Sequence, residues 1–305
     1  MTGALDDFSL LVSIKTPEDL LQRPLYQSVL DPQKSKLAEV LAPYYFDRPH
    51  PCGISNCRTP HQSGYLVITE DQKETNIGQI CGKKIFGDDF VIKANLQDKR
   101  ARLKHQLETL QEVRDRTPEL MERIASMLYR DLGAKWADLT LKAFREAVGQ
   151  AVFSQIRDKA RRGENLVEKV RPATADERAL HRQSNPSGRP LQFVSEKIGD
   201  LAGLGFLNAY PTAILTSLKD KLFELGGLDG KALAAGPRKA WVDWAGSIEL
   251  TLDGVESNLT DAVRFFSQQN FQLLPALGKD QKEHDSLAQV RWSDSERRVI
   301  AKTAR

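Results

Sequence analysis

Hydrophobic residues recur at three- and four-residue steps over much of the chain, which is the periodicity of amphipathic helices. Three helices are predicted between residues 91 and 162. Thr117-Pro118 marks the start of the second, and Gly163 ends the third. Another helix follows Pro211 and closes at Gly226-Gly227. Its apolar face carries Ile214, Leu218, Leu222 and Leu225.

The longest predicted helix covers residues 238–274. Its apolar positions alternate between four- and three-residue steps, which is a heptad seam. The seam consists of Trp241, Ala245, Ile248, Leu252, Val255, Leu259, Ala262 and Phe266. Trp244, Leu250 and Phe265 widen this face beyond what a two-stranded coil needs, so the pattern favours a helical bundle. We therefore expect residues 191–305 to form a C-terminal helical bundle, with a last helix near 293–304.

Two segments depart from the long helical periods. Residues 1–50 carry short helix signals, including Asp31-Pro32 before the stretch LAEVLAPYY, and are expected to form an N-terminal helical segment. Residues 163–190 hold few large apolar side chains and end in Asn-Pro, Ser-Gly and Arg-Pro turn signals. They are interpreted as a linker or mobile loop, which leaves residues 106–162 as a helical lobe.

A period of two replaces the helical period in residues 64–80. Tyr65, Val67 and Thr69 alternate with Leu66, Ile68 and Glu70 along the first strand, and Glu70-Asp71-Gln72-Lys73 makes the turn, which predicts a β-hairpin. All three cysteines flank the hairpin, at positions 52, 57 and 81. An odd number of cysteines within one short region favours a metal site over a disulfide framework.

Cys52, Cys57, His61 and Cys81 are the predicted ligands of one structural zinc ion. Zinc prefers four tetrahedral ligands drawn from thiolate and imidazole, and three cysteines with one histidine are an established set. The returning strand of the hairpin is expected to bring Cys81 beside the first loop. His50 is the alternative fourth ligand, although its place directly before Pro51-Cys52 makes joint ligation with Cys52 awkward. The competing interpretation is three neighbouring buried thiols without a metal.

The order of knuckle, hairpin, knuckle and helix resembles treble-clef zinc modules over about residues 50–105. The spacing C-x4-C-x3-H-x19-C departs from the commoner C-x2-C pairs of such modules. With residues 51–105 as this module, the fold class expected is mainly α with a small zinc-bound β-hairpin and a C-terminal helical bundle.

Basic residues gather around the module and on the helix after it. Those predicted to contact nucleic acid are Arg58, Lys83, Lys84, Lys93, Lys99, Arg100, Arg102 and Lys104. Such a face would follow a phosphate backbone through charge pairing and counterion release. The alternative is a solvated helix face, opposite a leucine face formed by Leu96, Leu103, Leu107 and Leu110.

Composition narrows the class of protein only moderately. The chain has 305 residues, a net charge of +3 and 40% hydrophobic residues, values that fit an ordinary globular protein and a nucleic-acid partner. No run of apolar residues is long enough to span a membrane, and the N-terminus lacks the pattern of a secretory signal, so a cytoplasmic location is expected. No phosphate-binding loop, dinucleotide fingerprint or nucleophile elbow occurs, and neither an enzyme nor a small-molecule substrate is expected.

The function expected is therefore a non-enzymatic, zinc-stabilised nucleic-acid-binding protein, as a subunit of a larger nucleoprotein assembly whose protein partners dock on the C-terminal bundle. A small zinc module joined to such a bundle is similar in outline to the large subunits of multi-subunit CRISPR effector complexes. The alternative function is a protein–protein adaptor, in which the zinc site is purely structural and the heptad helix recruits a partner helix.

Overall fold

The computed structural model describes residues 12–186 and 188–301. It is about 57% helical with small antiparallel sheets, which confirms the expected mainly α class in this general form. The described chain forms two compact units. One runs up to Val113 and includes Leu228–Ala245, and the other comprises Arg114–Gly227 and the described residues from Gly246 on. None of the described helices is both long and apolar enough to cross a membrane.

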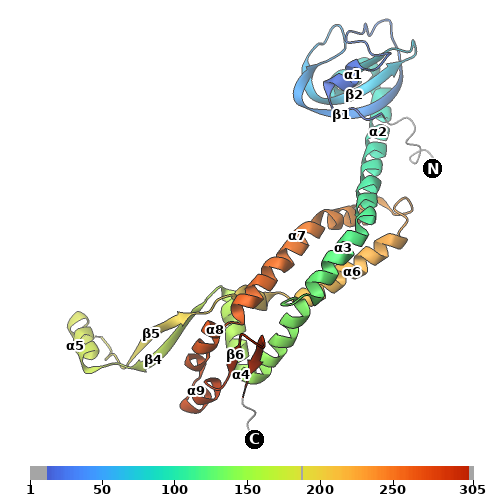
Figure 1. Ribbon diagram of the computed structural model, residues 1–305. Helices are drawn as coiled ribbons and strands as arrows, with labels where there is room; N and C mark the ends of the chain where they lie inside the picture. Colours follow the sequence, from blue (N-terminus) through green and yellow to red (C-terminus); the bar gives the residue numbers. More distant parts are fainter. Residues whose placement is uncertain (1–11, 187, 302–305) are drawn as a thin grey trace. The chain divides into compact units, whose positions relative to one another are not determined.

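The first unit is built on a three-stranded antiparallel sheet (Figure 1). Its strands are β1 (Leu37–Pro51), β2 (Pro60–Thr69) and β3 (Glu74–Ile77), in that order across the sheet. The short helix α1 (Pro17–Leu21) precedes them. The predicted hairpin is confirmed as β2 and β3, and the Thr69 amide donates a 2.9 Å hydrogen bond to the Lys73 carbonyl across the predicted turn.

A helix is expected over the stretch LAEVLAPYY that follows Asp31-Pro32. This expectation is wrong, because the residues from Leu37 on form β1. Val40, Ala42, Tyr44 and Phe46 are buried in alternation, and Ala42 lies opposite Leu66 of β2. LAEVLA suits a helix by local propensity, but the aromatic run that follows it packs well only on a pleated surface. Pairing with β2, which lies about 25 residues further along the chain, therefore overrides the local helical propensity.

Helix α2 (Gln79–Asp115) follows the hairpin and bends at Gly87, whose φ of +66° is non-helical. Phe90, directly after the bend, is fully buried and meets the ring of Tyr65 edge to face at 5.5 Å. The core of the sheet therefore extends onto the first turns of α2. Leu103 and Leu110 of the predicted leucine face are also buried.

The second unit contains the predicted helices as α3 (Thr117–Tyr129), α4 (Ala134–Arg162) and α6 (Pro211–Gly227), joined by the C-terminal part of α7 (Ala235–Phe265). The seam positions from Ile248 to Phe266 are all buried. Phe144 of α4 contacts Phe265, Phe266 and Phe271 edge to face.

Helix α7 ends earlier than predicted because Ser267 caps a new helix, α8 (Gln268–Leu273), by accepting a hydrogen bond from the Asn270 amide. The short helix α9 (Gln281–Leu287) and two 3-10 turns, η1 (Leu204–Asn208) and η2 (Leu274–Leu277), also belong to this unit.

Two further sequence expectations are wrong. The expected linker is an antiparallel ribbon of β4 (Leu166–Pro172) and β5 (Phe193–Asp200), with α5 (Ala175–Ser184) inserted at its end. The helix expected near 293–304 is a hairpin of β6 (Arg291–Ser293) and β7 (Arg298–Ile300), and residues 302–305 lie outside the described chain. The ribbon of β4 and β5 and the hairpin of β6 and β7 are both short and polar, so neither shows a strong hydrophobic alternation in the sequence.

Candidate metal centre

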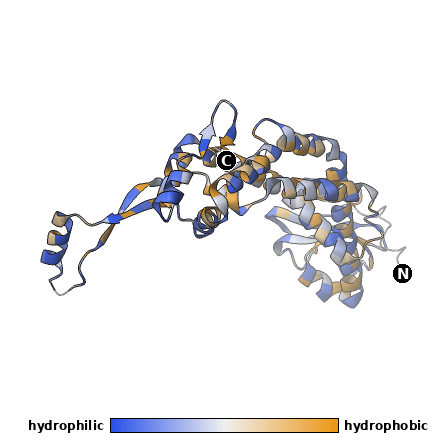
Figure 2. Cartoon of the chain, turned by 90° about the horizontal axis from the view of Figure 1, so that it is seen from below, coloured by the Kyte–Doolittle hydropathy of each residue, from blue (hydrophilic) through white to orange (hydrophobic). Residues whose placement is uncertain are grey.

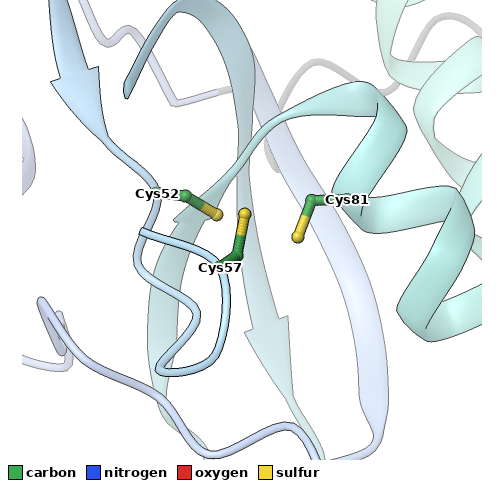
Figure 3. A group of neighbouring side chains, drawn as sticks. All are labelled: Cys52, Cys57 and Cys81. Atoms are coloured by element: carbon green, nitrogen blue, oxygen red, sulfur yellow. The ribbon is translucent and has the colours of Figure 1, made fainter. Parts of the chain in front are cut away.

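The three cysteines come from two elements of the first unit. Cys52 and Cys57 lie in the loop between β1 and β2, and Cys81 lies in the first turn of α2. Cys52 is fully buried, and the other two are partly exposed. Figure 3 shows the three thiols directed toward one another.

The loop between β1 and β2 is fixed by backbone hydrogen bonds. The Ile54 carbonyl accepts from the amides of Cys57 at 3.1 Å and Arg58 at 3.2 Å, which closes the knuckle. Gly53 lies so close to β3 that a Cβ there would be 2.0 Å from Oγ1 of Thr75, so only glycine fits. The Arg58 guanidinium donates to the Cys52 carbonyl at 3.1 Å. These contacts fix the positions of both cysteines in the loop.

The three sulfur atoms lie within 4.8 Å of one another. Zinc–thiolate bonds of about 2.3 Å at tetrahedral angles place sulfurs roughly 3.8 Å apart, so small side-chain shifts suffice to bind one ion. The cluster opens into a pocket of about 640 Å³. The cysteines lie at one side of that pocket, together with His61, Lys84 and neighbouring polar and apolar side chains.

The protonation states of the thiols differ with their surroundings. Burial raises the pKa of Cys81 to about 12 and also raises the pKa of Cys52. Hydrogen bonds from Thr59 lower the pKa of Cys57 to about 7. Two of the three thiols therefore resist ionisation on their own, and a divalent cation would supply the positive charge that stabilises three neighbouring thiolates.

His61, the predicted fourth ligand, lines the same pocket but stands outside the group of three sulfurs. Its Nε2 atom is 2.7 Å from the Tyr44 hydroxyl, and its Nδ1 atom is 3.1 Å from the Thr59 carbonyl oxygen. His50 pairs with His61 across β1 and β2 and packs its ring against Phe46. Neither histidine belongs to the cluster as the structure places it.

Sequence reasoning missed the buried polar residues that support the loop. Asn76 of β3 is fully buried and donates to the Tyr44 hydroxyl at 3.2 Å and to the Pro51 carbonyl at 2.9 Å. Its side-chain oxygen accepts a 2.7 Å hydrogen bond from Tyr26. A chain of hydrogen bonds thus leads from Tyr26 through Asn76 and Tyr44 to His61. A lone asparagine in a short strand gives no sequence signal for this role.

The predicted basic residues divide into two sets. Four are exposed and form no ion pair with any residue that the structure describes: Lys83, Lys84, Lys99 and Arg102. The other four are engaged. Arg58 donates to backbone carbonyls, Arg100 is buried with a partner of its own, and two lysines are paired: Lys93 with Asp89 and Lys104 with Glu108.

Comparisons with protein families, with curated proteins and with solved structures returned no match. The likeness in outline to CRISPR effector large subunits therefore stays an expectation from the sequence.

Proposed function

We propose that Cys52, Cys57 and Cys81 hold a structural zinc ion, and that the unit so stabilised binds nucleic acid without catalysing a reaction. One observation supports the proposal above all: the two thiols of the knuckle and the thiol at the start of α2 lie close enough together to bind one ion. Thiolates are soft ligands that select zinc among the common divalent ions. The binding free energy then stabilises a small sheet that has a limited core of its own.

His61 is the residue we propose as the fourth ligand. It is the only other side chain lining the pocket, among those described, that belongs to the types zinc ordinarily takes. Its Nε2 atom would leave the Tyr44 hydroxyl and turn toward the sulfurs, while the contact between Nδ1 and the Thr59 carbonyl keeps the ring oriented.

Nucleic acid is the proposed partner because two of the four unpaired cations lie next to the cluster and the other two lie further along the same helix. Lys83 and Lys84 follow Cys81 in the first turns of α2, and Lys99 and Arg102 share one face further along this helix. Exposed lysine and arginine without acidic partners are available to neutralise phosphates. The zinc ion would fix the start of α2 and thereby the position of the first two.

A charge-neutralising variant tests this contact. The full chain with Lys83, Lys84, Lys99 and Arg102 each changed to Gln is expected to bind DNA or RNA at least roughly tenfold more weakly near 0.15 M salt. The matched control changes four ion-paired cations to Gln: Lys34, Lys73, Lys239 and Arg264. Equal loss in both variants, or no binding by the wild type, would refute the proposal.

The adaptor function receives less support. The heptad seam proposed to recruit a partner helix is buried within the chain's own core from Ile248 to Phe266. A partner docking on the C-terminal bundle would have to use side chains outside the seam, such as the exposed Phe223 of α6 or Leu250 of α7. Salt-insensitive association with a protein, with no nucleic-acid binding, is the result that would favour an adaptor.

A further inference from the structure

The ribbon of β4 and β5 ends in a helix that contributes nothing to a core. All ten residues of α5 are described, and none is buried. An isolated helix of this length is marginal in water. Figure 1 shows α5 at the end of the ribbon away from the packed helices of its unit.

Specific contacts fix α5 to the ribbon despite its lack of burial. Thr174 and Glu177 form a capping box at its first turn. Arg171 of β4 donates to both carboxylate oxygens of Glu177, at 2.7 and 2.8 Å, and to Glu196 of β5 at 3.0 Å. One arginine therefore ties both strands to the helix, and the position of α5 is set by charge rather than by apolar packing.

The charges of the ribbon and of its tip are arranged differently. Along the strands, Arg171 and Lys197 are paired with acids. From residue 178 to residue 195 the sequence has three arginines and no Asp or Glu. These arginines, Arg178, Arg182 and Arg189, are exposed, and none is ion-paired with a described residue. Arg178 and Arg182 are four residues apart and so share one face of α5.

Apolar side chains accompany these arginines on the ribbon. Phe193 is 59% exposed and Val170 is 66% exposed, and the strand register places both on one face. Figure 2 shows both hydrophilic and hydrophobic stretches on the ribbon. A ribbon that carries an exposed phenylalanine and has unpaired arginines at its tip suits a partner that offers phosphates and flat apolar surface together, as nucleic acid does.

We propose that the tip of this ribbon is a second nucleic-acid contact, specific for double-stranded DNA. The major groove of B-DNA admits either an α-helix or a two-stranded ribbon, whereas the corresponding groove of an RNA duplex is too narrow for either. The three arginines neutralise phosphates at the groove edges, and Phe193 packs against bases or sugars. This contact lies in the second unit and is distinct from the four cations of α2, so each can fail without the other.

The test uses the full chain with Arg178, Arg182 and Arg189 changed to Gln. Affinity for a DNA duplex is expected to fall roughly tenfold or more near 0.15 M salt. The slope of log affinity against log salt should become shallower by up to about 0.9 for each phosphate that the variant no longer neutralises. The matched control changes three ion-paired arginines to Gln: Arg161, Arg162 and Arg264. It should bind as the wild type does.

A Phe193→Ala variant separates apolar contact from charge, since it should weaken duplex binding while leaving the salt slope unchanged. Unaltered duplex affinity in the triple variant overturns the proposal, as does preference for single strands, RNA duplexes or anionic phosphatidylserine vesicles. If the α2 variant loses binding and the tip variant does not, this inference fails while the proposed function stands.

Discussion

The carboxylate of Glu74 is buried in β3, so a neighbouring group has to compensate for the lost contact with water. Its side chain is 4% exposed, and Arg23 meets it through two hydrogen bonds, one from Nη2 to Oε1 at 2.7 Å. The hydrogen bonds that Arg23 donates to Glu74 also raise the pKa of Arg23. A buried ion pair need not stabilise more than apolar residues would, but removing one partner leaves an uncompensated charge.

Arg23→Ala is expected to lower the free energy of unfolding of the first unit by roughly 3 kcal/mol, because Glu74 loses its partner in a buried position. The matched control is Lys34→Ala, which breaks the exposed pair with Asp31 and should change stability by less than about 0.5 kcal/mol. Denaturant unfolding of both variants measures the difference. Equal, small effects would contradict the account of Glu74.

At the scale of elements, helices α3 and α7 are joined by a ladder of charges. Arg123 of α3 and the residues that cap this helix, Arg116 and Arg130, follow one another at seven-residue steps and so lie on one side of it. They pair with Glu249, Asp253 and Glu256 of α7, and Arg123 contacts two of these acids, at 2.7 and 2.9 Å. The ladder lies outside the buried seam, on the solvent side of the contact between these helices.

Arg123→Ala removes two rungs of this ladder and should destabilise the second unit by up to about 1 kcal/mol, since all the groups involved are partly solvated. The loss should shrink in 1 M salt, where the wild type has already lost most of the screened attraction. Thermal unfolding at low and high salt measures both effects. A loss that does not change with salt would mean that packing, and not charge, is involved.

The attachment of α5 to the ribbon should depend on pH. The hydrogen bonds from Arg171 lower the pKa of Glu177 to about 2, from an ordinary value of 4.5. Because the folded pKa is the lower one, the stabilisation is complete above about pH 4.5 and is lost as the pH falls through about 2. NMR shifts of the α5 amides should lose their helical values in that window.

Glu177→Gln is the control for this pH dependence, because its side chain does not titrate. Its α5 signals should already be weakened at neutral pH and should show no transition between about pH 4.5 and pH 2. Wild-type α5 shifts that stay constant down to pH 2 would show that Glu177 does not hold the helix.

At the scale of the whole molecule, the sequence predicted best what depends on local periodicity. The helices with buried leucines on one face, such as α6, and the hairpin of β2 and β3 follow from spacing alone. Strand β1 does not, since its partner is distant and its first half has helical propensity. Apart from Val167, the residues of the ribbon of β4 and β5 are exposed or only partly buried, so no alternating burial pattern marks it.

The candidate site shows the same division between local and long-range information. Clustering of three cysteines in the sequence was enough to predict that they meet, and the structure brings their sulfurs together. The contact of His61 with Tyr44 depends on the register of β1 against β2, which spacing does not reveal. The charge ladder between α3 and α7 likewise depends on how two distant helices pack.

Native mass spectrometry of the purified chain tests the metal centre most directly. The account predicts one zinc ion per chain in the wild type and in a Ser55→Ala control, whose altered side chain lies on the same knuckle but is not a ligand. It predicts loss of the ion in Cys52→Ser and Cys81→Ser, and weaker retention against a chelator in His61→Ala. A wild-type chain without metal, or a full zinc complement in both cysteine variants, would contradict it.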